Sequence, residues 1–154
     1  MATAIDVARY IVAFFQEAGD PVSNLKLQKL LYYVQGWSLA LDGKPAFPDR
    51  LEAWVHGPVQ PSVYGTFKSY RWNPIVEAQS PVTLPDDLKS TVSSVLETYG
   101  ADSGYELELR THQEPPWLTA RGGLAPDEES KSEITHDSMA QFFKSLADDA
   151  KEAE

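Results

Sequence analysis

The sequence predicts a mostly α-helical fold: a single compact helical domain with a central buried helix and a small β element. Apolar residues recur at helical spacing in four stretches. One of these, 25–41, is apolar almost all round, as is typical of a helix packed on several sides. Only residues 51–56 alternate as a strand does. The 154 residues suit one domain, which we place at 1–146, with an acidic tail at 147–154 that is expected to fray.

The first helix is predicted to begin after Thr3, whose capping-box partner is Asp6, and to end before Gly19. Its apolar stripe is Ala8, Ile11, Val12 and Phe15. The central helix is expected to run from Leu25 to Leu41, because eleven of these seventeen residues are apolar or aromatic.

Two cations, Lys26 and Lys29, lie near the start of this central helix, where the helix dipole disfavours positive charge. They are either solvated or placed beside an acidic group, and two solvated lysines are the favoured interpretation.

Residues Leu51 to His56 are predicted to form a strand that the pair Gly57-Pro58 ends. A single short strand is not stable alone, so a partner strand is implied, although the pattern does not identify it. A short helix is expected to follow from Pro61 to Lys68.

The C-terminal half is predicted to hold two clear helices. Residues 72–85 contain three prolines and are expected to form a loop, with Pro85 starting a helix that ends at Gly100. Residues 104–112 fit a strand and a helix equally well. The pair Pro115-Pro116 stops that element, one more turn follows, and Thr135 is expected to cap the last helix. Its stripe is Met139, Phe142, Phe143 and Leu146.

Composition excludes several classes of protein. The absence of cysteine excludes disulfides, thiol catalysis and Cys-ligated zinc. The net charge of −10 argues against nucleic acid as the main partner, since duplex binding requires Lys and Arg to neutralise phosphates. No stretch has the length of a transmembrane helix and no signal-peptide layout is present, so a cytoplasmic protein without a membrane partner is expected.

The charge is divided unevenly along the chain. Residues 1–75 hold seven basic and six acidic side chains, whereas residues 76–154 hold six basic and seventeen acidic ones. An acidic half serves either solubility, the favoured interpretation, or the steering of a basic partner.

No catalytic or metal site and no cofactor are predicted. The segment from His112 to Glu114 resembles the H-x-E opening of zinc deaminases, but the cysteines that complete their site are missing. A metal- or acid–base-dependent hydrolase that uses His56, His112 and Glu114 remains the alternative from the enzyme class.

Three segments, taken together, resemble the Panacea domain, the family of SocA-like antitoxins and phage-associated GepA-like proteins. They are KLQKLLYYVQGW at 26–37, EAWVHGPV at 52–59 with the Pro, Tyr, Phe and Lys that follow it, and THQEPPW at 111–117 with Ala120 and Arg121. The resemblance covers nearly the whole chain, from Ile5 to Leu146.

The resemblance implies a mainly helical, non-enzymatic antitoxin that neutralises a cognate toxin by direct protein–protein binding. Many members carry an extra N-terminal DNA-binding region, for which this chain leaves no room, so direct binding of nucleic acid is not expected. A phage or host regulatory adaptor without a toxin partner is a further alternative. The identity of the toxin and the oligomeric state stay open.

The motif segments also supply the candidate partner-binding residues. These are Trp54, His56, Gly57, Pro58, Val59, Tyr64, His112, Glu114, Trp117 and Arg121. Tryptophan and tyrosine are favoured at interface centres, and a rigid turn presents its neighbours at low entropic cost. A structural role is the favoured alternative for each of them, because a family motif often records the fold rather than a binding surface.

Overall fold

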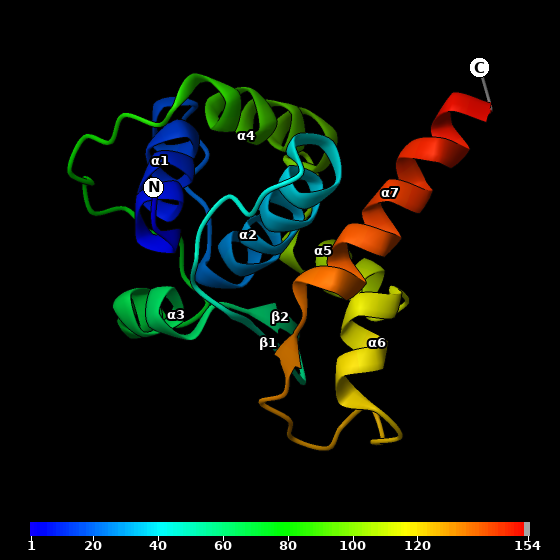
Figure 1. Ribbon diagram of the computed structural model, residues 1–154. Helices are drawn as coiled ribbons and strands as arrows, with labels where there is room; N and C mark the ends of the chain where they lie inside the picture. The colour runs from blue at the N-terminus through cyan, green and yellow to red at the C-terminus, as the bar shows by residue number, and fades with distance from the viewer. Residues whose placement is uncertain (153–154) are drawn as a thin grey trace.

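A computed structural model describes residues 1–152 of the chain, which form seven α-helices and one three-stranded sheet (Figure 1). The helices are α1 (Ala4–Glu17), α2 (Asn24–Trp37), α3 (Pro61–Phe67), α4 (Asp86–Tyr99), α5 (Gly104–Thr111), α6 (Pro115–Arg121) and α7 (His136–Glu152). The strands are β1 (Leu51–Trp54), β2 (Gly57–Val59) and β3 (Glu133–Ile134). The predicted fold class, mostly α with a small β element, is therefore confirmed.

Helix α2 lies at the centre of the molecule, as its sequence predicts. Eleven of its fourteen residues are buried, and α1, α4, α5 and α7 pack around it. Gly36 allows α7 to approach closely, because a Cβ atom at that position would overlap the Phe143 ring of α7. The helix continues into a wider π-helical segment, η1 (Ser38–Asp42), and the chain then turns at Gly43 with a φ of 69°.

The first and fourth helices form as expected. Thr3 caps α1 in a capping box with Asp6, and the stripe Ala8, Ile11, Val12 and Phe15 is buried. Helix α4 buries the predicted stripe Leu88, Val92, Val95, Leu96 and Tyr99 against the core.

The sheet differs from the expectation at its turn. The antiparallel order is β2-β1-β3, with Trp54 paired to Gly57 and Leu51 paired to Ile134. The chain reverses at Val55 and His56, so Gly57-Pro58 begins the second strand instead of ending the first. The partner strand that the pattern did not identify is the segment directly after the turn.

The ambiguous segment 104–112 is a helix. Ser103 caps α5 in a capping box with Glu106, and Leu107 is fully buried. Two prolines stand at the start of α6, where a missing backbone N–H costs little. The short turn between α5 and α6 brings His112 and Glu114 back towards α2 and the hairpin.

Helix α7 packs against η1, α2 and α6 along one side of the body, and its last turns project from it (Figure 1). The Oγ1 atom of Thr135 accepts a hydrogen bond from the Ser138 amide at 3.2 Å, as the predicted cap requires. Met139 and Phe143 are buried, and Phe142 and Leu146 are half-buried. Residues 147–152 continue the helix with no buried side chain, and 153–154 lie outside the described residues, so fraying of the tail stays a prediction.

Within residues 1–152, no helix combines the length and the apolar character needed to cross a membrane.

Candidate functional site

The three motif segments meet in one place, where α2, the β1–β2 hairpin and the α5–α6 turn pack together. The ammonium group of Lys29 donates to the Pro58 carbonyl at 3.0 Å, which joins α2 to β2. The indole N–H of Trp117 donates to the Trp54 carbonyl at 2.8 Å, which joins α6 to β1. These two bonds join residues that are 29 and 63 positions apart, so distant segments form a single polar frame inside the fold.

Lys29 is fully buried, so the expectation of two solvated lysines is wrong for it. Burial lowers the pKa of its ammonium group to about 7, while the negative charge of Glu108 acts in the opposite direction. The lysine lies under Gly57, where φ is +105° and a Cβ atom would come within 2.8 Å of the lysine Cε. The position therefore favours glycine for both space and backbone conformation.

The second lysine, Lys26, is half-buried. Its ammonium group donates to the Gly100 carbonyl at 2.6 Å and lies 4.8 Å from the centre of the Phe15 ring. Burial lowers its pKa, and the charges of Asp20, Asp102 and Glu106 raise it. The alternative expectation, an acidic group nearby within the chain, therefore describes Lys26 better than solvation does.

Glu114 is a buried carboxylate held by two tyrosines of α2. It accepts hydrogen bonds from the Tyr32 hydroxyl at 2.9 Å and from the Tyr33 hydroxyl at 3.2 Å. Burial raises the pKa of the carboxyl to about 7, whereas the hydrogen bonds from the two hydroxyls act in the opposite direction. The Tyr33 ring also stacks on Tyr99 of α4 at 3.9 Å, so the carboxylate anchors the α5–α6 turn to the centre of the fold.

The side chains of His112, Trp117 and Arg121 stack in one column. The His112 ring lies 4.2 Å from the Trp117 ring, and the Arg121 guanidinium lies 4.7 Å from the same ring. Arg121 donates to the Ala53 carbonyl at 3.2 Å and so joins α6 to β1. Burial lowers the pKa of His112, and its buried Nε2 has no hydrogen-bond partner among the described residues.

The exposed part of the site surrounds the hairpin. The Trp54 and Tyr64 rings pack edge to face at 5.0 Å, and both side chains are half-buried. His56, at the hairpin turn, is 75% exposed, and its Nδ1 lies 3.3 Å from a carboxylate oxygen of Glu108. We call the solvent-accessible group of Trp54, His56, Tyr64 and His112 the hairpin surface.

The ten candidate residues thus divide into two sets. Four of them, the hairpin surface, reach solvent at least in part. The other six are buried and take part in the fold: Gly57, Pro58, Val59, Glu114, Trp117 and Arg121. Any influence of these six on a partner acts through the residues that they position.

The sequence alone did not identify Lys29, Tyr32 and Tyr33 as members of this frame. One signal for Lys29 was available, since a helix that is apolar all round leaves no solvated face for a lysine in its second turn. For the enzyme alternative, the described residues contain no group of three or more His, Asp or Glu side chains that fits a metal ion.

Comparison with known proteins adds the family. The family model described as Antitoxin SocA-like, Panacea domain matches residues 27–118. The chain is also similar to the protein named Antitoxin SocA from Caulobacter vibrioides (strain NA1000 / CB15N), with 49% identity over 49 residues. That match spans 32% of this chain and only 26% of the relative. No solved structure matches significantly. The matched residues include most of α2, the whole hairpin and the whole of α5. Because the family model spans more than half of the chain, the chain belongs to the SocA-like, Panacea-domain family.

Proposed function

We propose that this chain is a non-enzymatic antitoxin that neutralises a cognate toxin by direct protein–protein binding. The observation that carries the proposal is the family match over residues 27–118, which includes the segments that form the buried frame. Neutralisation by contact requires that the two proteins share a compartment, and we propose that this is the cytoplasm.

The hairpin surface supports a binding role and is the proposed contact region. Trp54 and Tyr64 offer a paired aromatic surface of the kind that is favoured at interface centres. The hairpin beneath them is held by Lys29 and Trp117, so little conformational freedom is lost when a partner binds.

The position of Glu114, one of the three candidate acid–base residues, also favours binding over catalysis. The two oxygens of Glu114 face the hydroxyls of Tyr32 and Tyr33, and the side chain is 8% exposed. General acid–base work requires that the group reach a substrate, and this carboxylate is directed into the core.

Co-expression tests the proposal. Each open reading frame next to the gene is expressed alone and together with this chain, with a stop codon early in this gene as the control. We expect one neighbour that arrests growth alone and is harmless with the intact gene but not with the interrupted one. If no neighbour is toxic, or if protection survives the stop codon, the antitoxin proposal is wrong, and a regulatory adaptor becomes the better account.

A further inference from the structure

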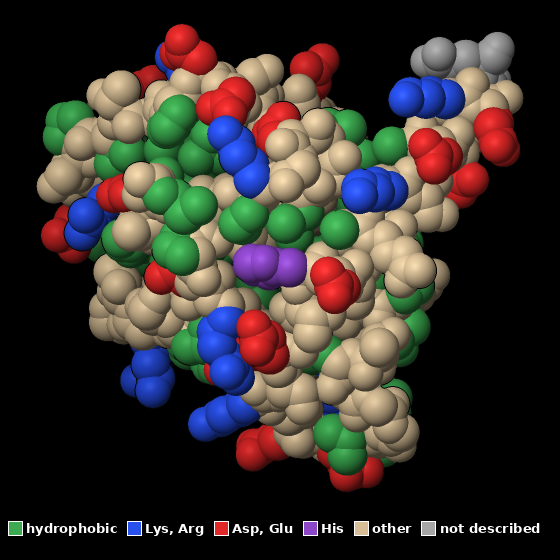
Figure 2. Space-filling model, viewed as in Figure 1, with side chains coloured by type: hydrophobic (Ala, Val, Ile, Leu, Met, Phe, Trp, Pro, Cys, Tyr) green, Lys and Arg blue, Asp and Glu red, His purple; other side chains and the backbone are tan. Residues whose placement is uncertain are grey.

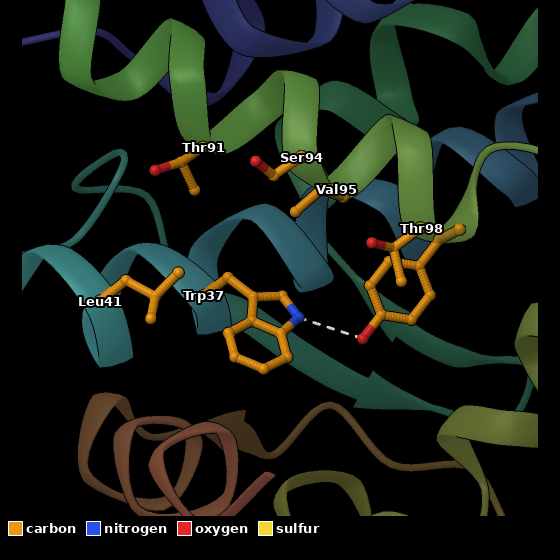
Figure 3. A pocket seen from close by; sticks show the side chains of 7 residues that line it. Trp37, Leu41, Thr91, Ser94, Val95 and Thr98 are labelled. Carbon is orange, nitrogen blue, oxygen red and sulfur yellow. Dashed lines mark hydrogen bonds between the residues drawn. The ribbon is translucent and has the colours of Figure 1, made fainter. Parts of the chain in front are cut away.

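An apolar groove runs along the seam between η1 and α4. It contains a hollow of about 200 Å³ whose lining includes Trp37, Leu41, Thr91, Ser94, Val95 and Thr98 (Figure 3). A second hollow of about 170 Å³ is lined in part by Ser38, Asp42, Lys44 and Asp87 and shares no lining residue with the first. The Thr91 hydroxyl, in the lining of the first hollow, donates to Asp42, in the lining of the second, at 2.8 Å, so this bond lies between the two hollows. We call the first hollow, between η1 and α4, the α4 groove.

The shape of the α4 groove suits a helix. Residues 91, 94, 95 and 98 follow the i, i+3, i+4, i+7 pattern of one helical face, and residues 37 and 41 form the facing wall with a spacing of four. From Thr91 to Thr98 the wall is about 10 Å long, which is about two helical turns. Leu41 is 60% exposed at the edge of the groove, so apolar surface there is free to be covered.

The helical elements around the groove carry more acidic than basic side chains, and one of the acids, Asp87, is paired with Lys44 at 2.7 Å. Helix α7 borders it, because the Phe143 ring lies 5.2 Å from the Trp37 ring. Together α4, η1 and α7 carry eight acidic and three basic side chains. The acidic ones are Asp42, Asp86, Asp87, Glu97, Asp137, Asp148, Asp149 and Glu152, and the basic ones are Lys89, Lys144 and Lys151. Figure 2 shows several acidic side chains, with basic ones beside them, on the projecting end of α7, across a notch from the body.

We propose that the α4 groove binds a basic amphipathic helix of the toxin, as a contact separate from the hairpin surface. The inference rests on the proposed function, since it names the segment of the toxin that would fill this groove. Apolar side chains of that helix enter the hollow beside Trp37 and Leu41, and its Lys or Arg residues face the acids of α4 and α7. The apolar contact slows dissociation, and the complementary charge speeds association.

Two neighbouring serines provide a matched test. Ser94 lines the groove, Ser93 does not, and both are exposed on α4. The indole of Ser94→Trp fills the hollow, whereas that of Ser93→Trp points elsewhere. The binding probe is the purified product of the neighbouring gene that is toxic on its own. We expect Ser94→Trp to raise its Kd about ten-fold or more, with Ser93→Trp within about two-fold of the unchanged chain. Thermal unfolding confirms that both variants are folded.

A second pair of variants tests the charge of the occupant. Asp148→Lys with Asp149→Lys reverses two exposed acids on the projecting end of α7, and Glu17→Lys with Asp20→Lys makes the same change at the end of α1. The first pair is expected to slow association about ten-fold at low salt, and the second pair to have a much smaller effect. Faster association with the α7 pair would mean an acidic occupant and would overturn the proposal.

The outcomes separate this inference from the proposed function. If the unchanged chain does not bind the toxic product at all, the proposed function fails and the inference fails with it. If the unchanged chain binds and Ser94→Trp binds as tightly as Ser93→Trp, only the groove inference is overturned. If Ser94→Trp abolishes self-association and leaves toxin binding intact, the occupant is a second copy of this chain, and the groove inference is again overturned.

Discussion

The ammonium group of Lys29 lies 3.0 Å from the carbonyl oxygen of Pro58, fully buried between α2 and the hairpin. This bond joins the most buried helix to the start of β2, the strand that follows the exposed turn at His56. A lone cation in such a place is costly, because its desolvation is only partly offset by one carbonyl and by the charge of Glu108.

Replacing this lysine is therefore expected to change how stability depends on pH. With its pKa lowered to about 7 in the folded state, Lys29 binds fewer protons when folded than when unfolded between about pH 7 and pH 10. The free energy of unfolding therefore rises with pH across that window, by up to about 1.4 kcal/mol per unit. Lys29→Met keeps the volume and removes the titration, so we expect it to be the more stable protein at pH 6 and to lose that advantage by pH 9.

Urea unfolding of both proteins at several pH values makes the comparison. Lys29→Ala is the control for volume, and it is expected to lose about 2–4 kcal/mol relative to Lys29→Met because it leaves a cavity. A difference between the unchanged chain and Lys29→Met that is constant from pH 6 to pH 9 would show that Lys29 does not titrate in this range.

Glu114 is expected to have the opposite pH dependence. Its pKa is raised to about 7, so the folded state binds more protons than the unfolded state between about pH 4.5 and pH 7. The stability that the protonated Glu114 carboxyl contributes is fully present below pH 4.5 and is lost as the pH rises through 7. Glu114→Gln keeps an acceptor for the Tyr32 and Tyr33 hydroxyls and does not titrate. In urea unfolding, the Glu114→Gln variant is expected to be more stable than the unchanged chain at pH 8 but not at pH 4.5. A variant that is more stable at pH 4.5 and less stable at pH 8 would contradict a raised pKa of Glu114.

Gly57 is expected to tolerate no side chain. A Cβ atom would lie 2.8 Å from the Lys29 Cε and 2.9 Å from the Thr111 Oγ1, at a φ of +105°. We expect Gly57→Ala to destabilise the fold by more than about 1 kcal/mol. Gly65 in α3 is the matched control, because nothing lies within 4 Å of its Cβ position, and Gly65→Ala is expected to stabilise by about 0.5–1 kcal/mol. Equal melting temperatures for the two variants would argue against a closed frame beneath the hairpin.

The elements that follow a single periodic pattern were the ones that the sequence predicted well. The stripes of α1 and α4, their starts and the burial of α2 all follow from residues within one element. The turn of the hairpin was misplaced because Gly57-Pro58 usually marks a stop, whereas here this glycine meets Lys29 from a distant helix. Residues 104–112 stayed ambiguous for a similar reason, because a short segment with few apolar residues fits the periodicity of a helix and that of a strand. In the structure the segment is a helix that packs Leu107 into the core.

The candidate site was predicted only in part, for a related physical reason. The motif positions were identified, but their burial was not, because burial depends on which segments meet in three dimensions. The bonds from Lys29 to Pro58 and from the two tyrosines to Glu114 span 29 to 82 positions of sequence. No local pattern records such contacts.

The aromatic pair of the hairpin surface is expected to set how long a complex with the toxin lasts. Trp54→Ala removes one half of the edge-to-face pair and should mainly raise the dissociation rate, with a Kd about ten-fold higher or more. Trp72→Ala is the matched control, because Trp72 is 78% exposed and lies outside the hairpin surface. Surface plasmon resonance gives both rates, and equal dissociation rates for the two variants would remove the hairpin surface from the interface.

The acidic half of the chain is expected to set how fast the complex forms. Glu128, Glu129 and Glu133 are exposed near the sheet edge, and neutralising all three to Gln should slow association while dissociation changes little. Association of the unchanged chain should also slow as salt is raised, since screening shortens the range of attraction to ~8–10 Å. Stopped-flow mixing at two salt concentrations measures this, and a salt-independent rate would assign these acids to solubility alone.

Neutralisation by contact requires direct binding, which calorimetric titration of the purified chain into the purified product of the toxic neighbouring gene measures. We predict a saturable, stoichiometric complex whose affinity is weakened by Trp54→Ala and not by Trp72→Ala. The absence of a complex, both by calorimetry at two well-separated temperatures and by size-exclusion chromatography, in a pair that nevertheless shows protection in cells, would contradict neutralisation by contact.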